Sequence, residues 1–222
     1  MKKTEKLTYG IIGLGRFGMA LAASLAEAGC DILVLDKNEE KVRQARAYTD
    51  HAYVTSSLSK ETLTEAGIPN CDVVVVGIGK LLDVSILTTL TVVSLGVKRV
   101  IAKATTPEQG EVLQKLGAEV VYPESDMAVR LAKKLTSGSL IEFLSLSNEI
   151  EISEILLTDK LIGKNLAEAN LRGKFSLNII ALEHGDNTQI TLSPDYVFAE
   201  GDIIVVIGRG EDIRKFQNFL SA

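Results

Sequence analysis

The sequence predicts an α/β protein in which a doubly wound parallel sheet is followed by a small α+β module. Two observations favour this fold class. Short β-branched runs alternate with amphipathic stretches as far as about Leu135, as expected of buried parallel strands joined by helical crossovers. The alternation stops at the polar, glycine-containing stretch 136–140, TSGSL. We therefore expect two domains, residues 1–136 and residues 141–222.

The predicted parallel strands are short and bounded by turn residues. They are LTYGIIG (7–13), DILVLD (31–36), HAYVT (51–55), DVVVVGIG (72–79), RVIAKA (99–104) and EVVYP (119–123). Amphipathic helices are predicted between and after them, and several end in glycine, which commonly follows the last helical residue. They are RFGMALAASLAEAG (16–29), NEEKVRQARAY (38–48), SKETLTEAG (59–67), LDVSILTTLTVVSLG (82–96), PEQGEVLQKLG (107–117) and ESDMAVRLAKKL (124–135). Right-handed crossovers distribute such helices over both faces of the sheet.

The second domain is predicted from strand runs that lie closer together. They are NEIEISEILL (148–157), LNIIALEHGDNTQITLS (177–193) and DIIVVIG (202–208), and a helix, GEDIRKFQNFL (210–220), follows them. The segment HGDN at 184–187 is typical of a hairpin turn, so we expect the middle run to form two paired strands.

Composition excludes several classes of protein. A hydrophobic content of 46% in 222 residues is ample for a packed core and excludes a disordered chain. A net charge of -5 disfavours a general nucleic-acid binder, since such domains are usually basic. The two cysteines, Cys30 and Cys71, form no CxxC motif and fit buried thiols in a reducing compartment. With no signal-peptide pattern and no apolar run near the ~18 residues that cross a bilayer, we expect a cytoplasmic protein.

A glycine-rich turn joins the first predicted strand to the first helix. Gly13, Gly15 and Gly18 fit GxGxxG: the first permits the turn, the second lets backbone approach a pyrophosphate, and the third lets helix pack close to strand. The helix N-terminus supplies free N–H donors for an anion. Asp36 ends the second strand, where a carboxylate accepts from ribose hydroxyls and repels a 2′-phosphate, so NADP is disfavoured. The alternative is a fold without its ligand, in which Asp36 is only solvated.

Arg16 stands inside the glycine turn. A guanidinium there can reach a terminal phosphate, which favours ATP or ADP over NAD as the ligand. The alternative is a surface arginine on the first helical turn.

Catalytic groups are sparse. His51 opens a predicted strand and His184 lies at the hairpin turn, and both are better interpreted as structural or solvated side chains. Lys103 ends the fifth strand at the edge where ligands bind, so it is either a catalytic lysine or, as we prefer, a partner for phosphate or carboxylate. We therefore expect no enzyme. The second hypothesis is an NAD(H)-dependent oxidoreductase or an NADH redox sensor.

In its glycine turn, Asp36 and small C-terminal module, the chain resembles the RCK (KTN) family. Members of this family include the cytosolic regulatory subunits of bacterial Ktr and Trk potassium transporters. The resemblance covers essentially the whole chain, with an N-terminal nucleotide domain and a TrkA-C-like domain. The motifs that carry it are IIGLGRFG (11–18), VVVVGIG (73–79), SILTTL (85–90), GAEVVYPESDMAVRLA (117–132) and SLNIIAL (176–182).

The resemblance implies a regulatory function. Such subunits form rings, commonly octamers built from dimers, that dock at the inner face of the cell membrane on a potassium channel subunit. ATP and ADP compete for the glycine-turn site and stabilise different ring shapes. The implied nucleotide-binding residues are Gly13, Gly15, Arg16, Phe17, Gly18, Asp36, Lys37, Ser56, Gly79, Lys103 and Glu124. Glu124 is also the implied ligand of a divalent cation, Mg or Ca, although an acid at a helix N-terminus is favoured there by the dipole in any case.

One position departs from the family pattern. Many relatives carry an acid near the adenine after the third strand, where this chain has Ser56 in VTSSLS. The adenine preference implied by the resemblance is therefore weakened.

The resemblance also implies a second ligand, cyclic di-AMP, between paired C-terminal domains. The positions that match are Ile162, Arg172, Asn178, Ile179 and Pro194. An arginine suits a phosphate and apolar side chains suit a base. The alternative is that Ile162 and Ile179 belong to the core and Pro194 to a turn.

The predicted helix 82–96 has more apolar surface than one sheet face needs. We expect it to form contacts between subunits together with the predicted helix 124–135.

Overall fold

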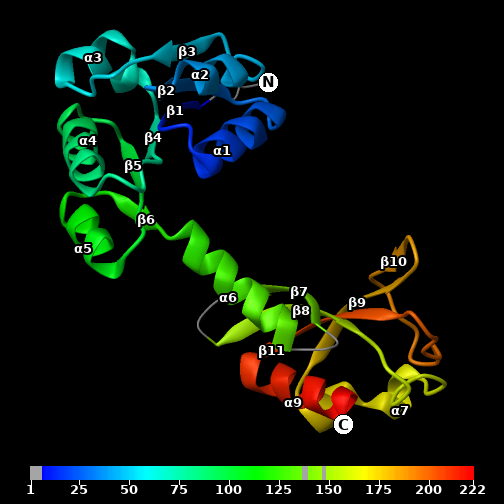
Figure 1. Ribbon diagram of the computed structural model, residues 1–222. Coiled ribbons are helices and arrows are strands. Elements are labelled where there is room, and N and C mark those ends of the chain that lie inside the picture. The colour runs from blue at the N-terminus through cyan, green and yellow to red at the C-terminus, as the bar shows by residue number, and fades with distance from the viewer. Residues whose placement is uncertain (1–6, 137–139, 147–148) are drawn as a thin grey trace. The chain divides into compact units, whose positions relative to one another are not determined.

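The computed structural model describes residues 7–136, 140–146 and 149–222. The chain divides into two compact units, Met1–Met127 and Ala128–Ala222 (Figure 1). Each unit is built around its own sheet.

The first unit contains a parallel sheet in the order β3-β2-β1-β4-β5-β6, as far as the described residues extend. Its strands are β1 (Thr8–Ile12), β2 (Asp31–Asp36), β3 (His51–Val54), β4 (Val73–Val76), β5 (Arg99–Lys103) and β6 (Glu119–Val121). All six correspond to the predicted runs, so the doubly wound fold class is confirmed. The strand order reverses between β1 and β4, and crevices for ligands open at such switch points.

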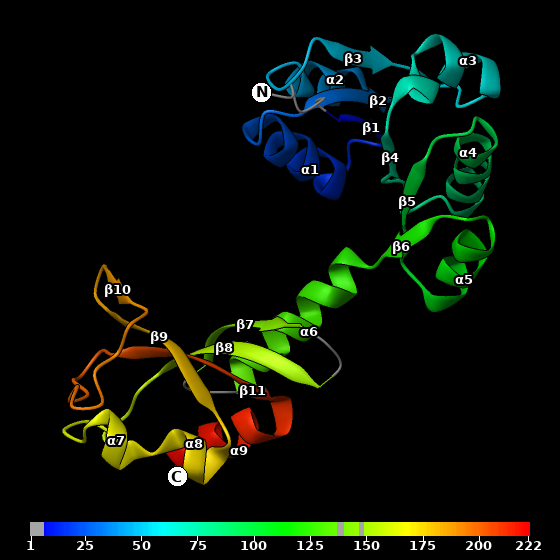
Figure 2. The same cartoon turned by 180° about the vertical axis from the view of Figure 1, so that it is seen from behind.

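Helices cover both faces of this sheet (Figures 1 and 2). They are α1 (Arg16–Glu27), α2 (Glu39–Ala45), α3 (Lys60–Glu65), the short 3-10 helix η1 (Ile68–Asn70), α4 (Leu82–Ser94) and α5 (Pro107–Lys115). Ala22 of α1 and Val42 of α2 pack on Ile11 and Val34 from one face. From the other face, α3, α4 and α5 contribute Leu63, Val92 and Leu113 to a cluster around Val74 and Val76.

Helix α6 (Pro123–Thr136) spans the division between the units, which falls between Met127 and Ala128. The sequence analysis placed the domain boundary later, at 136–140, because the polar residues begin there. Residues 137–139 of that stretch lie outside the described residues.

The second unit contains an antiparallel sheet, β10-β9-β11-β8-β7, within its described residues. Its elements are β7 (Leu140–Ser145), β8 (Ile150–Leu156), α7 (Leu166–Ala169), α8 (Leu171–Phe175), β9 (Asn178–His184), β10 (Asn187–Gln189), β11 (Ile203–Arg209) and α9 (Gly210–Ser221). Phe216 and Leu220 of α9 pack on a cluster with Ile155, Leu182 and Ile204. The predicted hairpin is present, with Asn187 opposite His184 across the turn.

Strand β7 was not among the predicted strands. Its pairing with β8 shifts register between Leu140 and Glu142. Such a shift breaks the two-residue alternation by which a strand is recognised in a sequence.

Candidate nucleotide site

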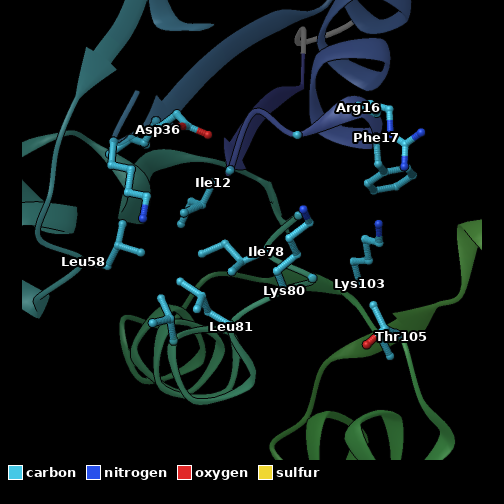
Figure 3. A pocket seen from close by; sticks show the side chains of 18 of the residues that line it. Ile12, Arg16, Phe17, Asp36, Leu58, Ile78, Lys80, Leu81, Lys103 and Thr105 are labelled. Carbon is cyan, nitrogen blue, oxygen red and sulfur yellow. The ribbon is translucent and has the colours of Figure 1, made fainter. Parts of the chain in front are cut away.

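A cleft of about 860 Å³ opens at the carboxyl edge of the parallel sheet. It lies wholly within the first unit and is formed by the ends of β1, β2 and β5 and by the segments that follow the strands of the sheet, including those after β3, β4 and β6. Figure 3 shows Asp36 and Leu58 on one side of the cleft and Arg16, Phe17 and Lys103 on the other.

The glycine turn forms the floor of the cleft. Gly13 has a φ of +99°, which favours glycine, and its N–H donates to the Leu35 carbonyl at 2.8 Å. A Cβ on Gly15 would meet no atom within 4 Å, so the backbone is open to a ligand at this position. Gly18 differs, because it is buried and does not line the cleft. A Cβ on Gly18 would lie 2.1 Å from the Gly13 oxygen, so its role in the structure is close packing of helix on turn.

Asp36 already has backbone partners. Its Oδ2 accepts from the N–H of Leu14 at 2.6 Å and its Oδ1 accepts from the N–H of Asn38 at 2.8 Å. The carboxylate therefore ties the glycine turn to the start of α2. A carboxylate offers about four acceptor positions, so capacity is left for ribose hydroxyls.

Helix α1 points its N-terminus at the cleft. Its N-cap is Gly15, and no side chain caps the first turn. Arg16 is exposed at the first helical position, and Phe17 beside it also lines the cleft. A free helix N-terminus with an arginine is a favourable place for a phosphate.

Lys103 is largely buried and bonds to the carboxylate of Glu124 through its Nζ. The same ammonium lies 6.0 Å from the centroid of the Phe17 ring, within range of a cation–π contact. The hydrogen bond from Lys103, with a smaller contribution from the charge of Arg16, holds the pKa of Glu124 below its ordinary value. These contacts join the ends of β5, α1 and α6 at one side of the cleft.

The other predicted nucleotide residues also lie at the cleft. Lys37, Ser56 and Gly79 all line it. Gly79 has a packing reason as well, since a Cβ there would lie 3.3 Å from the side chains of Lys103 and Thr105.

Sequence reasoning missed much of the cleft wall. The additional side chains are apolar or basic for the most part, and among them are Lys41, Leu58, Ile78, Lys80, Leu81, Val84, Thr105 and Tyr122. Ile78, Lys80 and Leu81 follow β4 directly, and that position at the carboxyl edge was the signal that could have identified them. The apolar members suit a planar base.

Charge in the cleft is opposite to that of the whole chain. Among the described lining residues, five are cationic (Arg16, Lys37, Lys41, Lys80 and Lys103) and two are acidic (Asp36 and Glu124). The chain itself has a net charge of -5. A local excess of positive charge in an acidic protein favours a ligand with several negative charges.

Glu124 has a lysine as its partner and lies in no cluster of carboxylates. Within residues 7–136, 140–146 and 149–222, no group of three or more His, Cys, Asp or Glu side chains could hold a metal ion. A cation at Glu124 would need further ligands from a nucleotide or a second subunit, and the metal assignment stays a prediction.

The predicted cyclic di-AMP residues all belong to the second unit. Arg172 on α8, Asn178 at the start of β9 and Pro194 are exposed, whereas Ile179 packs against the unit's core. The core placement of Ile179 agrees with the alternative interpretation of that residue. The second-ligand assignment stays a prediction.

The two histidines lie outside the cleft. His51 is exposed at the start of β3. The Nδ1 of His184 lies 2.7 Å from Asp202 Oδ1, and Asp202 also accepts from Tyr196 and from the backbone of Ala199. Asp202 is fully buried, so His184 helps to satisfy a structural carboxylate.

Residues 9–123 match the TrkA-N domain family, and residues 150–221 match the TrkA-C domain family. The chain belongs to the RCK family. It is 33% identical to Ktr system potassium uptake protein A of Bacillus subtilis (strain 168), over 98% of this chain and 99% of that protein. It is 35% identical to Ktr system potassium uptake protein C of the same organism, over 96% of each chain.

Solved structures of RCK proteins are also similar to this RCK chain. The GsuK RCK domain matches with a TM-score of 0.52 at 25% identity, over 98% of this chain and 47% of that one. The GsuK channel bound to NAD matches with a TM-score of 0.53 at 25% identity, over 100% of this chain and 40% of that one. The RCK chain thus spans less than half the length of these two proteins.

No helix in the described part of this RCK chain is long and apolar enough to cross a membrane.

Proposed function

We propose that the protein is a cytosolic regulatory subunit that senses adenine nucleotides and gates a membrane potassium uptake system. The observation that carries this proposal is the cleft, where a carboxylate and an apolar wall lie opposite a cationic helix N-terminus. That layout fits a nucleoside on one side and its phosphates on the other. The near full-length similarity to two Ktr potassium uptake proteins supports the biological setting.

ATP and ADP are the proposed ligands because the cationic side of the cleft exceeds the need of the internal pyrophosphate of NAD, which has no terminal phosphate. Arg16, Lys80 and Lys103 line the cleft together with the uncapped start of α1. Each further phosphate charge is stabilised by such a group. A ligand shifts an equilibrium between two conformations only by binding one of them more tightly, so the terminal phosphate is the group through which ATP and ADP differ.

An NADH sensor is the second candidate. A similar solved structure, the GsuK channel, is bound to NAD, and the cleft here is large enough for a dinucleotide. We assign no catalytic role to either histidine in this alternative, because neither lines the cleft.

Assembly is part of the proposal. Leu87 and Leu90 are one turn apart on α4, and both are exposed. Met127 and Leu135 on α6 are exposed as well. Exposed apolar rows of this kind mark surfaces that contact other chains. We propose that they pair copies of this subunit within a ring, commonly octameric in the family, which docks at the membrane through its channel partner.

Isothermal titration with ATP, ADP and NADH tests the ligand. We expect ATP and ADP to bind more tightly than NADH, and Arg16→Ala to weaken ATP by about tenfold, the equivalent of one charge-assisted hydrogen bond. Arg46→Ala is the matched control, since Arg46 is exposed on the first unit but does not line the cleft. Tighter binding of NADH than of ATP would favour the second candidate, and unchanged ATP affinity in Arg16→Ala would remove the phosphate assignment.

A further inference from the structure

Lys80 is one of the cationic residues that line the cleft, and its surroundings assign it a more specific role than the others. It follows β4 and directly precedes Leu81, the N-cap of α4. Its side chain lines the cleft, and Figure 3 shows it extending into the cleft in the direction of α1, as Lys103 does. The two ammonium groups therefore approach the glycine turn from neighbouring strand ends.

These two lysines differ in the partners of their ammonium groups within the chain. Lys103 is bonded to Glu124, which neutralises much of its charge. Lys80 has no hydrogen bond or ion pair with any part of the chain that the structure describes. The charge of Lys80 is thus fully available to a ligand.

The backbone beside Lys80 adds to this positive potential. Neither α1 nor α4, whose first residues border the cleft, has a side-chain cap. The helices α2, α3 and α5 of the same unit are each capped, by Asn38, Ser59 and Thr106 in turn. Lys80 is one residue before the N-cap of α4, so an ammonium and the uncapped N–H groups of that helix lie close together at the cleft. Asp83, the acid in the first turn of α4, does not line the cleft.

We propose that Lys80 binds the phosphate chain of the nucleotide and makes affinity rise with the number of phosphates. This inference rests on the proposed function. A lysine acts on phosphate as a mobile point charge on a long chain, and it can follow successive phosphates without a fixed geometry. Lys80 thus determines specificity by ligand charge, whereas Asp36 is placed to select the ribose.

The test is a titration of the full-length protein with ATP, ADP, AMP and adenosine at fixed salt concentration. In Lys80→Gln we expect the ATP dissociation constant to rise about tenfold, that of AMP to rise less than about threefold, and that of adenosine to stay unchanged. Lys80→Arg keeps the charge and should stay within about threefold of wild type for ATP. Lys115→Gln is the control for net charge, because Lys115 is exposed on α5 away from the cleft.

Two outcomes overturn the inference and separate its failure from that of the proposed function. In the first, wild-type protein binds ATP, and Lys80→Gln either loses affinity equally for adenosine and ATP or keeps its affinity for both. Lys80 then does not bind the phosphates, and the proposed function stands. If wild-type protein binds none of the four ligands, both fail together. A graded loss that follows phosphate number, restored by Lys80→Arg, supports the inference.

Discussion

At the scale of single residues, the carboxylate of Asp36 has a structural role beside its proposed role in binding. Its oxygens hold the N–H groups of Leu14 and Asn38, and the same group faces the cleft. The residue that we propose to bind the ribose therefore also fixes the shape of the glycine turn. A loss of nucleotide binding on its removal has two causes, which must be measured separately.

We expect Asp36→Ala to lower the free energy of unfolding by about 1.5–3 kcal/mol, the usual cost of losing a hydrogen bond to a charged group. Urea denaturation of the ligand-free protein measures the loss. Asp36→Asn keeps an acceptor and should lose less, and equal stability of Asp36→Ala and wild type would contradict the expectation.

The Lys103–Glu124 pair makes stability depend on pH in a defined direction. Because the pKa of Glu124 is held below its ordinary value, the pair stabilises the fold above that ordinary value of about 4.3 and is lost as pH falls through the lowered pKa. We expect Glu124→Gln to melt slightly below wild type at pH 7, since Glu124 is exposed, and the two melting temperatures to converge as the pH falls through the lowered pKa. A difference that stays constant as the pH is lowered would argue against the pair.

At the scale of elements, the contact between α1 and the glycine turn sets the geometry of the cleft. Gly18 packs its Cα against the Gly13 carbonyl, with no room for a Cβ. Because the obstacle is backbone and not a flexible side chain, a larger residue must displace the helix or the turn.

We expect Gly18→Ala to destabilise the protein by about 1–3 kcal/mol, as overpacking of a close contact does, and to weaken ATP binding as well. Differential scanning fluorimetry with and without ATP measures both effects. Ala20→Ser adds one atom on the exposed side of the same helix and is the matched control. A melting temperature and an ATP affinity equal to those of wild type in Gly18→Ala would show that the turn can accommodate a methyl group.

The sequence predicts best those parts of the site whose residues are close together along the chain. The glycine turn and the end of β2 can be read directly, because their spacing follows from one strand–helix–strand unit. The bond between Lys103 and Glu124 joins residues 21 positions apart on different elements, and it depends on β6 lying beside β5. Leu58 likewise reaches the cleft only through the position of β3 in the sheet. Contacts of this kind require the strand order, which periodicity alone does not determine.

At the scale of the whole molecule, each unit has its own core, and the cleft belongs to the first. Ligand binding should therefore stabilise one unit directly. At a nucleotide concentration of 100 times the dissociation constant, we expect about 2.7 kcal/mol of added stability. Hydrogen exchange should show the protection mainly in residues 7–127. Protection confined to the second unit would place the nucleotide elsewhere.

The exposed row on α4 gives a test of assembly. We expect Leu87→Glu to shift the protein towards smaller species, because a charge on a buried apolar contact is costly to desolvate. Analytical ultracentrifugation measures the change in mass. Glu65→Gln, an exposed substitution on α3, should leave the mass unchanged, and an unchanged mass in Leu87→Glu would exclude this row as the contact.

Because α6 runs through the division between the units, its ends have different neighbours. Glu124 at its start bonds to Lys103 in the cleft, and the helix continues to Thr136, beyond the division. A fragment cut at residue 127 would keep only the first five residues of α6, too few for a stable isolated helix. A fragment designed to contain the first unit alone should therefore end at residue 136, so that the helix that carries Glu124 remains complete.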